Sequence, residues 1–328
     1  MNRKHPIPVL RTIEIDRIDI EDRSFCLSWR LADQRLNDSI ALCGLINPPL
    51  LKSKNHGSFT IVCGFKRITS CEELGWKSVT AFVCEDQPDP LRCLFISFWD
   101  NLSHRRFNPV EKAIILQKFT AYLDEKQMIS DILPRLQLHA HTRELHRYLR
   151  IGELPDEAKK SLAEENLTVD TALLLLEFDP SARIPLLQFI LGLRLTASRQ
   201  KEVMDLIFEI CRREAVIPQD IIMDQAVIEI NSRKELSQPQ KSFFIHHWLR
   251  KRRYPRLCER EENFAAWLKE LHLESNITIQ PPPYFEGKIR SVRFTAASHQ
   301  EMGKVLEKLF SLYREGKLKP LFDDRYGL

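Results

Sequence analysis

Residues 59–67, FTIVCGFKR, place a strand, a glycine and the start of a helix in immediate succession. Phenylalanine, threonine, isoleucine and valine favour a pleated, buried strand, which predicts a strand over Phe59–Cys63. Gly64 follows it, and Phe65, Lys66 and Arg67 open a helix. Backbone N–H groups and two cations then converge at the positive end of that helix. The sequence therefore predicts an anion site at residues 64–67.

The residues on either side of this stretch indicate an α/β domain that covers residues 1–106. Strand-like patterns recur at Thr12–Ile18 and Val79–Val83, between amphipathic helical segments. The turn-forming residues 55–58, Asn-His-Gly-Ser, separate Leu50-Leu51 from the strand at Phe59. This arrangement predicts a β-hairpin.

The remaining chain divides into a helical part and a small mixed part. Residues 107–237 have an almost continuous helical pattern, which predicts an all-α middle domain. Residues 234–241 are polar and contain Pro239, as expected of a linker. Residues 242–328 predict a small α+β domain, with helices at 259–271 and 299–313 and strands at 276–280 and 289–294. The expected fold class is α+β with three domains.

Two helix caps support the predicted helices on either side of the boundary between the first and the middle domain. Asp89-Pro90 places a capping carboxylate before a proline, and predicts a helix that runs through Phe98. The sequence Asn108-Pro109-x-Glu111 repeats the arrangement with a carboxylate in the first turn. It predicts a second helix that extends to Leu123.

Composition excludes several classes of protein. The chain has 10 glycines in 328 residues and contains neither G-x-x-x-x-G-K-[ST] nor G-x-G-x-x-G, so neither common phosphate-loop motif is present. Its eight cysteines form no C-x-x-C pair, which argues against a zinc site. No apolar run approaches the roughly 18 residues of a membrane span. We therefore expect a cytoplasmic protein that does not enter a membrane.

A second polar pair lies at the end of the helix after Pro90. Asp100 and Asn101 offer the oxygen ligands that Mg²⁺ takes alongside phosphates. Cations at residues 66 and 67, together with these oxygens, suit a nucleoside triphosphate. The alternative for each element alone is a solvated charge pair or a simple helix cap.

In order and spacing these motifs resemble the ParB partition-protein family over residues 10–195. That family has a nuclease-like N-terminal domain with L-x-x-S-I-x-x-x-G leading to Q-P, then G-E-R-R-x-R-A, then E-N-x-x-R, followed by a helix-turn-helix. The first motif is matched by LNDSIALCGLINPP at 36–49, the second by GFKR at 64–67 and the third by DNLSH at 100–104. The resemblance assigns nucleotide contacts to Ser39, Gly44, Asn47, Gly64, Lys66, Arg67, Asn101 and His104.

The resemblance also implies a ligand, and the departures from the motifs limit the chemistry. It implies cytidine triphosphate or another nucleoside triphosphate, with Mg²⁺ held by Asp100 and Asn101. Phe65 replaces the glutamate of G-E-R-R, and His104 replaces the arginine of E-N-x-x-R. Asp100, the candidate catalytic residue, is shorter than the family's glutamate in a reaction that depends on positioning. We expect weak or absent hydrolysis of the nucleotide.

Two other functions remain open at this stage. The same N-terminal fold is shared, by resemblance, with sulfiredoxin and with a free-serine kinase, so a phosphotransferase or nucleotide hydrolase could use the pocket with Asp100 as base or metal ligand. Sulfiredoxin chemistry needs a cysteine where this chain has Phe65. A degenerate adaptor that binds only proteins is the third interpretation.

Residues 128–155 resemble the ParB helix-turn-helix, whose second helix enters the major groove of DNA. Between residues 101 and 150 there are nine Lys or Arg and five Asp or Glu, a surplus of four that equals the net charge of the whole chain, +4. Pro134 must end or bend the first helix. The alternative is an ordinary helical pair with solvated arginines. The residues expected to meet double-stranded DNA are Thr142, Arg143, His146, Arg147 and Arg150.

A third segment, residues 246–260, has six Lys or Arg against one Glu, with Trp248 and Tyr254 among them. Such a pattern serves nucleic acids through phosphate contacts and stacking, or equally a basic linker or an acidic partner. In ParB proteins the C-terminal domain dimerises, so the resemblance implies a homodimer through residues 242–328. The expected function is a nucleoid-associated DNA-binding protein, regulated by nucleotide, in chromosome or plasmid partition or in transcriptional regulation.

Overall fold

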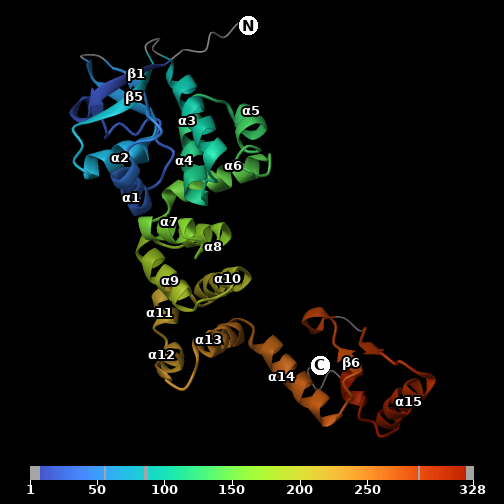
Figure 1. The fold of residues 1–328 in the computed structure, drawn as a ribbon. Coiled ribbons are helices and arrows are strands. Elements are labelled where there is room, and N and C mark those ends of the chain that lie inside the picture. Colours follow the sequence, from blue (N-terminus) through green and yellow to red (C-terminus); the bar gives the residue numbers. More distant parts are fainter. Residues whose placement is uncertain (1–7, 55–56, 85–87, 287–288, 323–328) are drawn as a thin grey trace. The chain divides into compact units, whose positions relative to one another are not determined.

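The computed structural model describes residues 8–54, 57–84, 88–286 and 289–322, and its chain separates into two compact units, Met1–Leu187 and Gln188–Leu328. Both units contain helices and strands, and helices predominate (Figure 1). The predicted α+β class is therefore confirmed. Each unit is described below by itself.

The first unit contains a five-stranded mixed sheet. Its β3 and β4 pair antiparallel, so the predicted hairpin is confirmed; residues 55 and 56 of its turn lie outside the described residues. β1 pairs antiparallel with β5, while β3 lies parallel to β5. The strands, in their order across the sheet, are β1 (Val9–Glu14), β5 (Ser78–Cys84), β3 (Leu50–Ser53), β4 (Phe59–Cys63) and β2 (Ile18–Asp19).

Three helices accompany this sheet: α1 (Gln34–Cys43), α2 (Phe65–Glu73) and α3 (Pro90–His104). Every residue of β4 is buried, as its β-branched and aromatic composition predicts, and α2 begins two residues after the strand ends. The Asp89 side chain caps α3 by accepting a hydrogen bond from the backbone N–H of Arg92. α3 runs through Phe98, as predicted, and continues to His104.

α4 (Pro109–Phe119) begins with the predicted capping box, formed by Asn108 and Glu111. It ends at Phe119, four residues before Leu123. A short helix follows, made of α5 (Glu125–Gln127) and one π-helical stretch, η3 (Met128–Ile132). This helix stops just before Pro134, as expected.

The rest of the first unit is helical. It contains α6 (Thr142–Leu149), η4 (Arg150–Glu153), α7 (Asp156–Ala163), α8 (Val169–Leu174) and η5 (Leu175–Glu177), and α9 (Pro180–Gly192) runs past its end.

The second unit is helical at its start and mixed at its end. The predicted linker at 234–241 is wrong in its second half, because α13 begins at Gln238. Ser237 and Gln240 form a capping box there, and Pro239 lies in the first turn, where its missing N–H costs nothing. The predicted strand pair and last helix are present, as β6, β7 and α15. The elements are α10 (Ala197–Glu214), α11 (Pro218–Ile222), α12 (Gln225–Ser232), α13 (Gln238–Arg253), α14 (Pro255–Glu270), β6 (Ile277–Gln280), β7 (Ser291–Phe294) and α15 (His299–Arg314).

The C-terminal part of the second unit has its own small hydrophobic core, to which α14, β6 and α15 contribute. Its buried members are Phe264, Trp267, Leu271, Ile279, Phe285, Leu312 and Leu321. No helix among the described residues is long and apolar enough to cross a membrane.

Candidate functional site

The turn between β4 and α2 brings the backbone of Gly64 against Pro49. Gly64 has a φ of 94°, a left-handed conformation that favours glycine. A Cβ atom at this position would lie 2.8 Å from the Cβ of Pro49 and 3.1 Å from Nε of Arg67. Only glycine therefore allows this close approach, which places the first turn of α2 beside the segment that leads into β3.

Arg67 uses this approach to join α2 to that segment. Its Nη1 donates to the backbone carbonyl of Asn47 at 2.8 Å and to that of Pro48 at 3.2 Å. Its Nη2 lies 3.9 Å from Oδ2 of Asp100, near the end of α3. Residues 67 and 100 therefore face one another, as a shared pocket requires.

These side chains line a cavity of about 480 Å³. Asn47, Arg67, Asp100 and His104 contribute its polar groups. Asp100 and His104 are one helical turn apart on α3, so both point to the same side. The rest of the cavity wall is largely apolar and consists of Pro8, Pro48, Leu50, Cys63, Phe82 and Ile96.

The thiol in this wall belongs to Cys63, which is buried. Burial raises the pKa of Cys63 far above its ordinary value, and the negative charge of Asp100 adds to the increase more than Arg67 offsets it. A thiol of this kind stays protonated, whereas thiol chemistry requires the thiolate. The cavity therefore lacks the feature that a sulfiredoxin-type reaction would need.

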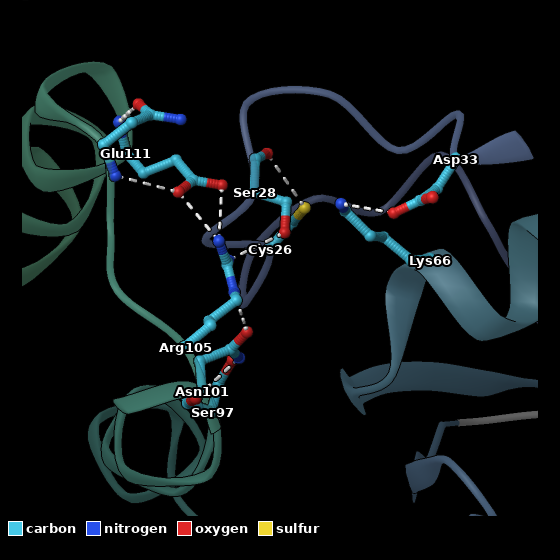
Figure 2. A network of polar contacts seen from close by, with 9 residues as sticks. Cys26, Ser28, Asp33, Lys66, Ser97, Asn101, Arg105 and Glu111 are labelled. Atoms are coloured by element: carbon cyan, nitrogen blue, oxygen red, sulfur yellow. Dashed lines mark hydrogen bonds and ion pairs between the residues drawn. The ribbon is translucent and has the colours of Figure 1, made fainter. Parts of the chain in front are cut away.

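Lys66 is not among the described residues that line this cavity. Its Nζ lies 3.1 Å from Oδ2 of Asp33, the residue that caps α1 (Figure 2). The hydrogen bond from Lys66 holds the pKa of Asp33 below its ordinary value. Both side chains are about one-third exposed, so this is a surface ion pair of small strength.

Asn101 is part of a different network, centred on Arg105 (Figure 2). The Oδ1 atom of Asn101 accepts from Nε of Arg105 at 2.9 Å, and its Nδ2 donates to the backbone carbonyl of Ser97. Arg105 also donates through Nη1 to both carboxylate oxygens of Glu111, at 2.8 and 2.7 Å, and through Nη2 to Ser28. The network thus joins the end of α3 to the start of α4.

Ser39 and Gly44 lie on α1 and at its C-cap, outside the residues that line the cavity. Among the described residues that line the cavity, Asp100 is the one carboxylate. Among the described residues there is no cluster of three or more His, Cys, Asp or Glu side chains that could hold a metal ion. The predicted site residues therefore divide into those that line the cavity (Asn47, Arg67, Asp100 and His104), Gly64, which shapes it, and those that lie elsewhere (Ser39, Gly44, Lys66 and Asn101).

The sequence interpretation missed the role of Arg105. The capping box of Asn108 and Glu111 was visible in the sequence, but a carboxylate used in a cap gave no sign of a cationic partner. Glu111 is 5% exposed. A buried carboxylate requires a partner. Arg105 and Arg106 are the nearest cations that precede Glu111 in the sequence, so Arg105 could have been proposed on that ground.

The predicted DNA-contacting residues of α6 also fall into two groups. Thr142, Arg143 and His146 are exposed, and the structure shows no ion pair for their side chains among the described residues. Arg147 pairs with Glu144 on the same helix and with Asp170, the latter at 2.6 Å.

Arg150 donates to Glu177 at 2.8 Å and is likewise neutralised. Leu145 and Tyr148 of α6 are buried, and they hold the opposite side of the helix against the unit. The exposed side of α6 therefore offers one unpaired arginine, one histidine and one hydroxyl.

Comparison with known proteins finds relatives over about two thirds of the chain. The nucleoid occlusion protein of Bacillus cytotoxicus is 21% identical over 215 residues, which cover 64% of this chain and 72% of that protein. The nucleoid occlusion protein of Bacillus mycoides is also 21% identical, over 60% of this chain and 66% of its own length. No family model matches the chain.

A solved structure of similar kind is the C-terminally truncated chromosome-partitioning protein ParB of Caulobacter crescentus, complexed to the centromeric parS site. It is 20% identical and covers 60% of this chain and 98% of its own, with a TM-score of 0.35. That score is too low to establish the arrangement of domains. The predicted resemblance to the ParB family is nevertheless confirmed, since nucleoid occlusion proteins are members of that family.

Proposed function

From this resemblance, we propose that the chain is a ParB-like, nucleoid-associated DNA-binding protein of the cytoplasm, whose first unit binds a nucleoside triphosphate. It acts in chromosome or plasmid partition, nucleoid occlusion or transcriptional regulation. The nucleotide biases how the protein engages DNA, which requires that it favour one arrangement of the chain over another. The domain division at residues 106 and 237 belongs to this proposal.

The observation that carries the proposal is the cavity in which Arg67 faces Asp100. The guanidinium supplies donors for a phosphate. The carboxylate would repel that phosphate unless a divalent cation lay between them. The pair therefore suits a phosphate chain with bound Mg²⁺, which takes one or two carboxylates and completes its shell with phosphate oxygens and water. When bound, the ion would neutralise phosphate charge beside Asp100.

Lys66 and Asn101 belong to the proposed nucleotide site, but each must first give up the contacts that it makes in this structure. The free energy of losing those contacts differs between the two. Lys66 leaves a surface ion pair with Asp33, which is worth at most about 1 kcal/mol. Asn101 is held by Arg105 in a partly buried network and would lose two hydrogen bonds. We therefore expect Lys66 to turn toward a triphosphate more readily than Asn101 turns toward a metal ion.

Hydrolysis of the nucleotide is expected to be weak or absent. Asp100 is the candidate catalytic carboxylate at the cavity, and His104 stands beside it in place of an arginine. An imidazole has no forked cation with which to hold a developing phosphate charge. A bound nucleotide would thus act as a regulator more than as a substrate.

The experiment that tests this function is calorimetric titration with cytidine and adenosine triphosphates, with and without Mg²⁺. Wild type should release heat with at least one of them in the presence of Mg²⁺, and Arg67→Ala should not. Arg35→Ala, an exposed arginine on α1 without an ion pair among the described residues, is the matched control. Absence of heat with every nucleotide would remove the nucleotide part of the proposal.

For DNA, the exposed side of α6 provides the contacts, through Thr142, Arg143 and His146. Arg147 and Arg150 remain part of the proposed interface, but each must leave a carboxylate before it can meet a phosphate. Direct contacts to bases and phosphates from the second helix are what a helix-turn-helix supplies.

A homodimer through the C-terminal part is proposed on the same resemblance. α15 has a stripe of exposed apolar side chains one turn apart, which a second copy could cover. Its members are Met302, Leu306, Phe310 and Tyr313.

A further inference from the structure

A second cavity in the first unit, of about 770 Å³, lies between the loop that joins α3 to α4 and the turn that precedes α6. One wall is made by residues 104–109 and by Lys112 of α4. The other is made by residues 135–137, with Glu165 at its side. We call this cavity the basic groove. It shares His104 with the nucleotide cavity but none of that cavity's other lining residues.

Three cations of the basic groove make no ion pair with any residue that the structure describes. Within the described part of the chain, the side chains of Arg106 and Lys112 make no hydrogen bond or salt bridge, and Arg135 only stacks on Trp99, at 5.0 Å from the ring centre. Arg105, by contrast, is committed to Glu111. Because Glu165 is the one acidic residue that the described lining includes, the groove carries a net positive charge.

The surroundings of Lys112 show that this charge is not fully solvated. Burial lowers the pKa of Lys112, and the charge of Glu144 offsets only part of the effect. Because Glu144 compensates this loss of water only in part, an anion in the groove would stabilise the ammonium of Lys112 further. α4 also begins at the groove, at Pro109, so the positive end of its dipole adds to the same field.

We infer that the basic groove binds the phosphodiester backbone of a DNA duplex, next to the part of the duplex that meets α6. This inference rests on the proposed DNA binding and names a contact surface beyond it. The turn at residues 135–137 precedes α6 by four residues; the first residue of α6 is Thr142, and its Arg143 is exposed. Backbone phosphates that flank a recognition helix pass close to the turn before it, and cations there fix the register of the protein on the duplex.

The test is the salt dependence of binding to a fluorescein-labelled duplex of arbitrary sequence, measured by anisotropy. The variant is Arg106→Ala with Arg135→Ala. Arg35→Ala with Lys77→Ala is the control, because it removes the same charge from exposed positions outside the groove.

Each phosphate contact that is lost should lower the slope of log Kd against log salt by about 1. The groove variant should therefore show a slope lower by about 1 to 2, and weaker binding at low salt, while the control keeps the slope of the wild type. Equal slopes in groove variant and control would overturn the inference. Thermal unfolding should show that both double variants are folded, since no ion pair is removed.

Failure of the inference can be told apart from failure of the proposed function. If the wild type binds no duplex at low salt, DNA binding itself is wrong and the groove assignment falls with it. If Arg143→Ala weakens binding and lowers the slope but the groove variant does neither, only the groove assignment is wrong.

A free polyphosphate could supply the same chemistry, and a second titration separates the two sources. Trp99 lies under Arg135, so its emission should change when the groove is filled, and Trp99→Phe identifies its share of the signal. Duplex should change this emission, and inorganic tripolyphosphate should compete only at much higher concentration. Tight tripolyphosphate binding that is lost in the groove variant, with an unchanged duplex slope, would assign the groove to free phosphates and overturn the DNA assignment.

Discussion

Two segments of this protein carry a similar surplus of cations but pair different fractions of them with carboxylates. Residues 101–150 exceed neutrality by four charges and residues 246–260 by five. In the second segment, four of the six cations form ion pairs with carboxylates of their own unit. These pairs join Arg250 to Glu261, Lys251 to Glu262, Arg252 to Glu214 and Asp224, and Arg253 to Glu209.

The aromatic residues of the second segment are also used internally. Trp248 lies under Arg252, and the hydroxyl of Tyr254 donates to Glu209. In the first segment, Arg106, Lys112 and Arg143 make no ion pair with a carboxylate in the described part of the chain. A charge surplus in the sequence therefore does not reveal whether cations are available to a partner, because the neutralising carboxylates are distant in the sequence.

The largest effect is expected within the first segment, where one arginine is paired and the next is free. Arg105→Ala leaves the carboxylate of Glu111 buried without its partner, which should lower the free energy of unfolding by about 2 to 3 kcal/mol. Arg106→Ala, at the adjacent free cation, should change it by less than about 0.5 kcal/mol. Urea denaturation measures both. Equal losses would show that the pairing does not distinguish these neighbours.

A smaller loss should follow in the second segment. Arg252→Ala removes one of the two arginines that pair with Glu214, together with an ion-pair partner of Asp224, and should destabilise the protein by about 1 to 2 kcal/mol. Arg256→Ala, an exposed cation of the same segment without an ion pair among the described residues, is the control and should be nearly neutral. Neither change should alter the salt slope of duplex binding. An altered slope for Arg252→Ala would mean that the paired cations also meet DNA.

Arg143→Ala should leave the stability of the protein unchanged but weaken its binding to DNA. This exposed side chain makes no ion pair within the ranges that the structure describes, so the unfolding free energy should stay within about 0.5 kcal/mol of wild type. The salt slope of duplex binding should fall by about 1, with weaker affinity at low salt. Arg147→Ala is the comparison on the same helix. It should lower the free energy of unfolding, because it leaves Asp170 without its ion pair to Arg147. A loss of stability in Arg143→Ala without a change in the salt slope would contradict the assignment of Arg143 to the exposed, unpaired residues of α6.

The smallest effect is expected in the loss of stability at acid pH. The hydrogen bond from Arg252 holds the pKa of Glu214 below its ordinary value, against the opposite effect of burial and with further help from Arg213. A lowered folded-state pKa contributes stability that is present above the unfolded-state pKa and is lost as the pH falls through the folded-state value. Because the group is near the surface, the contribution should be below about 1 kcal/mol. Thermal unfolding of wild type and Glu214→Gln, from about pH 6 to about pH 3, should converge at acid pH; a constant difference would refute this pairing.

Much of the fold could be predicted because the relevant signals are local. The strand before Gly64, the hairpin before Phe59 and the capped starts of α3 and α4 depend on residues a few positions apart. α13 was missed at its start because a polar stretch with proline has the composition of a linker, although a proline in the first turn is compatible with a helix.

The candidate site could be predicted only in part. Neighbouring residues on a helix point about 100° apart, so Lys66 and Arg67 leave α2 in different directions, as Asp100 and Asn101 leave α3. Which member of each pair faces inward depends on distant partners, Asp33 for Lys66 and Arg105 for Asn101. Sequence spacing alone does not contain these contacts.

The central claim, that the free cations of the first unit meet DNA and the paired cations of the second do not, is tested most directly by hydrogen–deuterium exchange. Amide exchange would be followed by mass spectrometry, with and without saturating duplex. The account predicts slower exchange in peptides that cover residues 104–112 and 135–147, and no change in those that cover 246–260. Protection of residues 246–260, with none at the other two segments, would contradict it.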